Sequence, residues 1–113
     1  MYCMSNIRFN MVEDNLKPEE VTQTLLAIID GWLKEEGAYT TDVQGQMLAS
    51  HVKAMVTRAK TGEPLPEVDR SLFEEISDES MRLAERAVDM LPGLPIEEAY
   101  LLSVHFEIAR SNA

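Results

Sequence analysis

The sequence is poor in the residues from which many functional sites are built. It has one cysteine, Cys3, among 113 residues, which excludes an internal disulfide and a cysteine-based metal cluster. No apolar run approaches the roughly 20 residues that span a bilayer. Residues 1–15 lack the basic and then apolar pattern of a secretory signal. We therefore expect a cytoplasmic protein that does not enter the membrane.

Positive charge is also scarce. Ten Lys and Arg residues stand against twenty Asp and Glu residues, which leaves a formal net charge of −10. Nucleic-acid binding depends on basic side chains that neutralise phosphates. The densest basic group is Lys53, Arg58 and Lys60, and it has no interleaved aromatic residue on which a base could stack. We expect no direct contact with DNA or RNA, and a solvated acidic surface instead.

Motifs of catalysis and cofactor binding are missing as well. The sequence has no glycine-rich phosphate loop, no His-Glu-x-x-His pair and no Gly-x-Ser-x-Gly elbow. Its many carboxylates are spread along expected helix surfaces, where they are typical of solvated charge. We expect neither an enzyme nor a bound cofactor.

Helical periodicity is the feature that the chain does have. Apolar residues recur at helical spacing within four segments, which lie at about 18–37, 42–62, 71–91 and 95–108. Proline, capping residues and glycine mark their ends, and a break at Ser77 divides the third segment into a short and a longer helix. The pattern predicts one all-helical domain of four or five helices over residues 18–113. Residues 1–17, where Ile7, Phe9 and Met11 alternate, are expected to form an arm or a short strand.

The two histidines, His51 and His105, lie on the apolar stripes of different expected helices. One interpretation is structural, with each ring half-buried and bonded to a carbonyl. Another is a metal site completed by Glu98 or Glu107, although zinc usually takes three or four protein ligands.

Both histidines also fall within recognisable motifs. The stretch HVKAMVTR, from His51 to Arg58 and followed by TGEPL, resembles the first phosphorylation motif of PTS-regulation domains (PRDs). There a histidine and an arginine seven residues later share a helix face. The stretch LPIEEAYLLSVHF, which begins at Leu94, resembles the second motif, with Glu98 seven residues before His105. The resemblance covers roughly residues 18–110.

The resemblance implies an all-α, five-helix bundle that pairs as a homodimer. It also implies that His51 and His105 accept phosphoryl groups, with a phosphocarrier protein or a sugar-transport component of the sugar phosphotransferase system as the partner. Arg58 would then hold the phosphate, and Glu98 would orient His105 from another helix or from the other subunit. We expect both rings to approach a shared cleft with Arg58 near its rim.

The function that this resemblance implies is that of a regulatory module. Family regulators usually join such domains to an output domain, for which this chain has neither the length nor the charge. We therefore expect it to act through protein contacts in transcriptional or metabolic regulation. The alternative is a helical accessory module for a sugar-metabolism enzyme, which uses the fold without phosphorylation.

Overall fold

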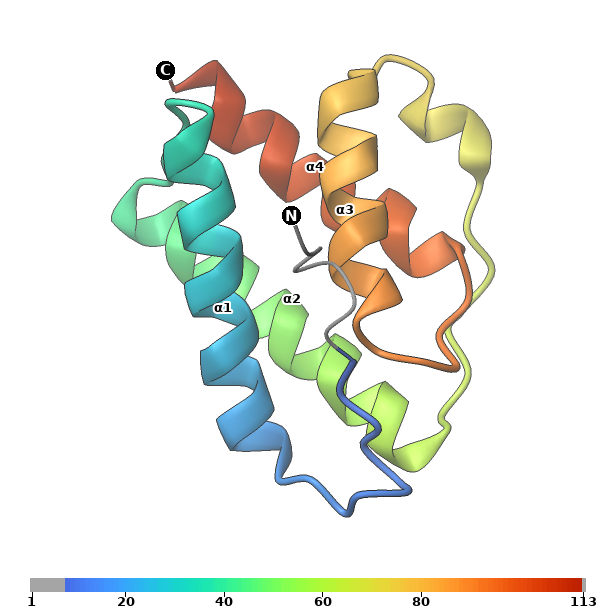
Figure 1. Ribbon diagram of the computed structural model, residues 1–113. Helices are drawn as coiled ribbons and strands as arrows, with labels where there is room; N and C mark the ends of the chain where they lie inside the picture. The colour runs from blue at the N-terminus through green and yellow to red at the C-terminus, as the bar shows by residue number, and fades with distance from the viewer. Residues whose placement is uncertain (1–7, 113) are drawn as a thin grey trace, which may run out of the picture.

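The computed structural model describes residues 8–112, and in this part of the chain the regular structure is helical. It consists of α1 (Pro18–Glu35), α2 (Asp42–Thr61), the short 3₁₀ helix η2 (Arg70–Phe73), α3 (Asp78–Asp89) and α4 (Glu97–Ser111), all seen in Figure 1. The prediction of an all-helical fold is confirmed, but five α-helices is one too many.

The predicted number of α-helices is wrong because of the segment between α2 and α3. Asp69 caps a single 3₁₀ turn there by accepting from the Ser71 backbone N–H. Ser77 then adopts extended backbone angles and caps α3 by accepting from the Ser80 N–H. An N-cap residue lies outside the helical conformation, so a continuous helix cannot cross Ser77. The expected break at this residue is therefore correct, and the short piece before it is only one turn long.

The ends of the longer helices follow the expected signals. Pro18 occupies the first turn of α1, where its missing N–H costs nothing. Thr41 caps α2 in a capping box with Gln44, in which each side chain accepts from the other residue's backbone N–H. Gly62 ends α2 with φ at 78°, a left-handed conformation that glycine adopts without strain. The last helix begins at Glu97, two residues beyond the expected Pro95.

The helices pack as two layers joined through α2 and α4. Helix α1 packs against α2, α3 packs against α4, and α2 contacts α4 (Figure 1). Each long helix gives a buried apolar stripe to one core, whose fully buried large side chains include Leu25, Ile29, Met55, Leu102 and Phe106. Trp32 is half-buried beside this core, and the Arg86 guanidinium lies 4.2 Å from its ring centroid.

Residues 8–17 form an arm along the helices. The Phe9 N–H donates to the Met90 carbonyl at 2.7 Å, and a turn follows at residues 11–15. Lys60 at the end of α2 donates to the Met11 carbonyl and to the Asn15 side chain. Of the two expectations for residues 1–17, the arm is what residues 8–17 form, while Ile7 lies outside the described residues.

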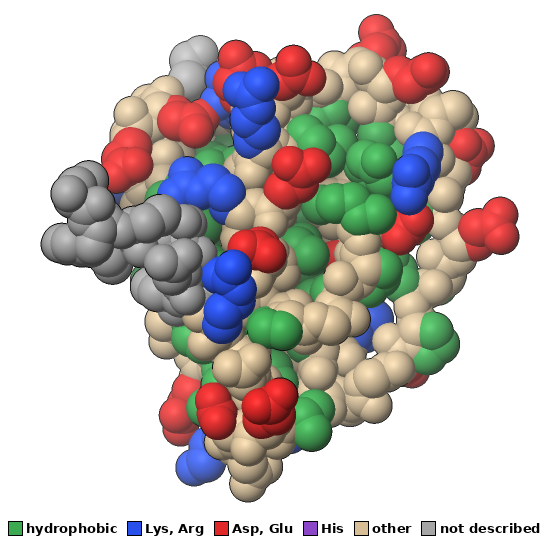
Figure 2. All heavy atoms as spheres, turned by 45° about the vertical axis from the view of Figure 1, so that its right-hand side comes forward, with side chains coloured by type: hydrophobic (Ala, Val, Ile, Leu, Met, Phe, Trp, Pro, Cys, Tyr) green, Lys and Arg blue, Asp and Glu red, His purple; other side chains and the backbone are tan. Residues whose placement is uncertain are grey.

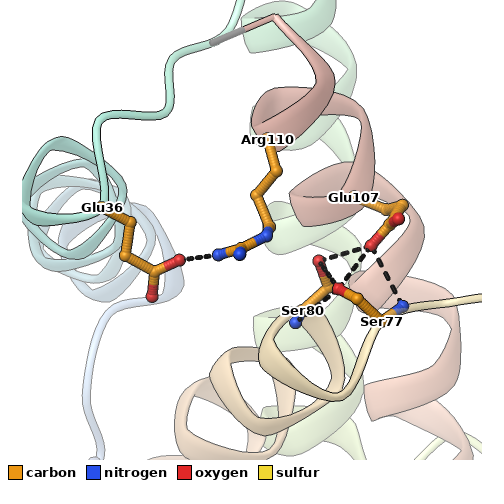
Figure 3. A network of polar contacts seen from close by, with 5 residues as sticks. All are labelled: Glu36, Ser77, Ser80, Glu107 and Arg110. Atoms are coloured by element: carbon orange, nitrogen blue, oxygen red, sulfur yellow. Dashed lines mark hydrogen bonds and ion pairs between the residues drawn. The ribbon is translucent and has the colours of Figure 1, made fainter.

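Two polar clusters connect α4 to its neighbours (Figure 3). The Glu107 carboxylate accepts from the backbone N–H and hydroxyl of Ser77 and from the hydroxyl of Ser80. The hydroxyl bonds of these serines lower the pKa of Glu107. Arg110, one turn further along α4, pairs with Glu36 after the end of α1. These contacts fix the orientation of α4, the helix that carries His105.

The surface of the molecule is rich in charged side chains (Figure 2). Figure 2 shows acidic and basic side chains intermixed around apolar areas on one face of the molecule. Among the described residues, no helix combines the length and the apolar character that crossing a bilayer demands.

Candidate functional site

The residues singled out in the two motifs meet where α2 and α4 run antiparallel to each other. Three pairs join the helices: Gln44 with Asn112, His51 with His105, and Arg58 with Glu98. From one pair to the next, the chain advances seven residues along α2 and goes back seven along α4. Seven residues are two helical turns, about 10.5 Å, so the pairs stack at a constant interval along one seam.

The central pair brings the two imidazoles together. The ring centroids of His51 and His105 are 5.1 Å apart, and the ring planes are inclined by 46°. Both side chains are partly exposed. The two rings therefore lie together, as expected, but neither lines the cavity that borders Arg58, so the expected shared cleft is not found there. Both rings are half-buried, as the structural interpretation has them, and His51 Nε2 has no hydrogen-bond partner.

Arg58 and Glu98 form the pair next to the histidines. Arg58 Nε donates to Glu98 Oε2 and Nη2 donates to Oε1, both at 2.7 Å. The Glu98 side chain is fully buried, and that of Arg58 is 16% exposed. This contact raises the pKa of Arg58 further above its usual range, chiefly through the hydrogen bond to Glu98. We expected Glu98 to orient His105, but both of its oxygens are engaged by Arg58.

Arg58 also faces a cavity of about 380 Å³ at the end of α2. The segment that follows the helix, residues 62–68, forms one wall, and the loop before α4 forms another. The guanidinium has five N–H donors and the pair with Glu98 uses two. Arg58 therefore has donors left for a ligand beside the seam.

The environment of the two rings keeps them neutral near pH 7. Burial, together with the neighbouring His105, lowers the pKa of His51 from 6.5 to about 4. Glu98 opposes this shift and Arg58 adds to it. Burial also lowers the pKa of His105. A neutral imidazole has a free lone pair on one nitrogen, which is the form that attacks an electrophile such as phosphorus.

Acidification is expected to destabilise the protein through His51. Because the folded-state pKa is below the unfolded value, the unfolded chain binds more protons between pH 6.5 and 4. The contribution is fully present above about pH 6.5 and is lost as the pH falls. At pH 5 the expected loss is about 1 kcal/mol, allowing for a partly exposed ring.

Urea unfolding of the wild type and of His51→Gln at pH 7.5 and 5.0 measures this contribution. The wild type should lose more stability between the two pH values than the variant does. Equal losses would contradict the assignment to His51. The lowered pKa of His105 acts in the same direction, so the difference between the two proteins, and not the loss in either one alone, measures the contribution of His51.

A metal site completed by a carboxylate finds no support in this geometry. Both acids considered for it are engaged elsewhere, Glu98 by Arg58 and Glu107 by the serines of α3. Within residues 8–112, no three His, Cys, Asp or Glu side chains are grouped so as to hold a metal ion.

The comparisons with known proteins bear on the fold of the chain. No family model matches the sequence, and no curated protein does either. Among solved structures, the fold is similar to the crystal structure of a PRD-containing transcription regulator from Lactobacillus casei ATCC 334 at 1.38 Å resolution. The two share 34% sequence identity with a TM-score of 0.78, over 83% of this chain and 84% of that chain. The chain belongs to the PRD family.

Within this PRD chain, sequence reasoning found four of the six seam residues and missed two. His51, His105, Arg58 and Glu98 stand out because each lies in a motif. Gln44 and Asn112 carry no such signal, since they are ordinary polar residues near helix ends. They are found only by extending the seven-residue interval outward along both helices, which requires knowing that α2 and α4 are antiparallel neighbours.

Proposed function

We propose that this PRD chain is a regulatory phosphoacceptor module of the sugar phosphotransferase system. It senses phosphorylation on histidine and acts through protein contacts in transcriptional or metabolic regulation in the cytoplasm. The observation that carries the proposal is the pair of neutral imidazoles 5.1 Å apart in the seam, with Arg58 in the adjacent pair. The similar solved structure, a PRD-containing transcription regulator, supports the regulatory role.

The chemistry suits these residues. Phosphoryl transfer depends mostly on positioning and on electrostatic stabilisation, and the acceptor needs only an accessible lone pair. A bound phosphoryl group adds about −1.5 to −2 charges and three acceptor oxygens. On a chain with a net charge of −10, that group stands next to the buried carboxylate of Glu98. The added charge therefore changes the electrostatic interactions within the α2–α4 seam and at any surface that packs over it.

The direct test is phosphorylation in solution. The purified chain is incubated with a phosphocarrier protein and its upstream kinase, and the intact mass is measured at neutral pH. The expected result is a gain in mass of a phosphoryl group that is absent from a His51→Gln/His105→Gln double variant. No gain in the wild type would refute the proposal and leave the alternative of an accessory module that is not phosphorylated.

Self-association is part of the same proposal. Apolar side chains lie exposed on the two helices that carry the histidines: Val43, 65% exposed, and Met47, 57% exposed, on α2, and Ile108, 37% exposed, on α4. Exposed apolar groups that gather on one surface favour contact with a partner, and a symmetric pair is the commonest assembly. We expect a dimer whose interface includes these residues.

Sedimentation velocity at tens of micromolar protein tests this expectation. Met47→Glu should shift the protein from dimer to monomer, because it places a charge in the apolar contact. Leu72→Glu is the matched control, since Leu72 is 75% exposed but lies on η2. A monomeric wild type, or an equal effect of both substitutions, would contradict the prediction.

A further inference from the structure

The two rings of the seam differ in how their nitrogens are placed. His51 Nε2 is buried and has no hydrogen-bond partner, the one side-chain nitrogen or oxygen among residues 8–112 in that condition. Neither nitrogen of His105 is in that state. A phosphorus atom must approach the accepting nitrogen along the direction of its lone pair. The packing around His51 closes that approach at Nε2.

The other nitrogen of His51 is disfavoured for a different reason. A neutral imidazole carries its proton on one nitrogen and its lone pair on the other. For Nδ1 of His51 to attack, the proton must lie on Nε2, where it would be a buried N–H donor without an acceptor. Orphaned buried donors are rare because they lose the hydrogen bond that water would give them. Both nitrogens of His51 are therefore poor acceptors.

The short distance between the two rings limits how many phosphoryl groups the seam can hold. Two phosphoryl groups on rings with centroids 5.1 Å apart would bring two charges of about −1.5 to −2 together. The charged groups that act on His51 from the packed elements are Glu98 and Arg58. Arg58 is already paired with Glu98, so it does not neutralise two further dianions. The repulsion between them is strong at this distance outside bulk water.

We propose that the histidine pair is a single acceptor that carries one phosphoryl group, and that His105 is the ring that receives it. This inference rests on the proposed function. The lone pair of a His105 nitrogen forms the new N–P bond while the bond from phosphorus to the donor breaks. The donor leaves with that electron pair, and the proton on the other ring nitrogen is released to solvent. His51 remains neutral and unmodified against the phosphorylated ring.

Phosphoramidate is the probe that tests the acceptor without requiring a protein surface to dock. Its P–N bond breaks as the histidine is phosphorylated, and ammonia leaves. Wild type, His51→Gln and His105→Gln are treated with phosphoramidate and, separately, with a phosphocarrier and its kinase. Intact mass at neutral pH gives the number of groups per chain. Fragment-ion mapping of the wild type shows which of the two histidines of the chain carries the phosphoryl group. This result does not depend on whether a variant folds.

The expected result is at most one phosphoryl group per wild-type chain, located on His105, with His51→Gln still an acceptor and His105→Gln inert. Two groups on one chain, or a single group mapped to His51, would overturn the inference while leaving the proposed function intact. A wild type that accepts nothing from either donor overturns the proposed function as well. The two failures are thus distinguished by the same measurements.

Discussion

Replacing Arg58 with alanine is expected to lower the free energy of unfolding by about 3–5 kcal/mol, the range typical of a buried ion pair that loses one partner. The reason lies in the group left behind. Glu98 is fully buried and both of its oxygens accept from Arg58 at 2.7 Å. Without the guanidinium, the carboxylate either stays charged without a partner or takes up a proton. Urea unfolding followed by circular dichroism at pH 7 measures the loss.

The residue before Glu98 in the sequence, Glu97, belongs to the ion pair that serves as the matched control. Glu97 pairs with Arg70 at 2.9 Å, but these side chains are 31% and 57% exposed. Exposed ion pairs contribute little because water solvates both partners, so Arg70→Ala should cost much less than Arg58→Ala. The double variant Arg58→Met/Glu98→Leu should recover much of the lost stability, since it removes both buried charges. Similar losses from Arg58→Ala and Arg70→Ala would contradict this account.

The ion pair between Arg58 and Glu98 could not be predicted from the sequence. Arg58 and Glu98 were each found through a motif, and each was assigned to a histidine: Arg58 to a phosphate on the first motif, Glu98 to His105. Their partnership with each other depends on the antiparallel alignment of α2 and α4 across 40 positions of sequence. No spacing within either motif contains that alignment, so the roles of both residues had to be read from the fold.

Leu102→Ala is expected to cost about 2–5 kcal/mol, the range for truncating a buried leucine. The side chain is fully buried against the core, so alanine leaves a cavity that the surrounding helices fill only partly. The adjacent Leu101 is only partly buried, and Leu101→Ala should therefore cost less than half as much. Chemical denaturation of both variants makes the comparison. If Leu101→Ala proved the more costly, the orientation of α4 described above would be wrong.

This pair of leucines also shows which side of α4 is buried. Leu101, Val104, His105 and Ile108 recur at helical spacing along one face of this helix. The buried face instead contains Glu98, Ala99, Leu102, Ser103, Phe106 and Ala109, while Ile108 is exposed. Because apolar residues occur on nearly every side of α4, periodicity alone does not fix which side is turned inward. The buried charge at Glu98 made the true face look more polar than the false one.

The buried face of α1 and the bounds of α1 and α2 were easier to predict. Helix α1 buries Val21, Leu25, Ile29 and Leu33, as its spacing indicates. Its bounds, and those of α2, follow from Pro18, Thr41 and Gly62, whose preferences are local and need no knowledge of the fold. The prediction thus succeeded where one residue decides a backbone conformation. It failed where two distant helices decide a contact.

The constant interval between the three pairs has a consequence for how the molecule can move. If α2 slid along α4 by one helical turn, about 5.4 Å, none of the three pairs would remain in contact. A slide of two turns towards the C-terminal end of α4 would set His51 against Asn112 and Arg58 against His105, leaving Glu98 buried and unpaired. Longitudinal sliding is therefore ruled out as a low-cost motion. The helices have one allowed register, so relative motion of α2 and α4 at low cost is limited to rotation or separation.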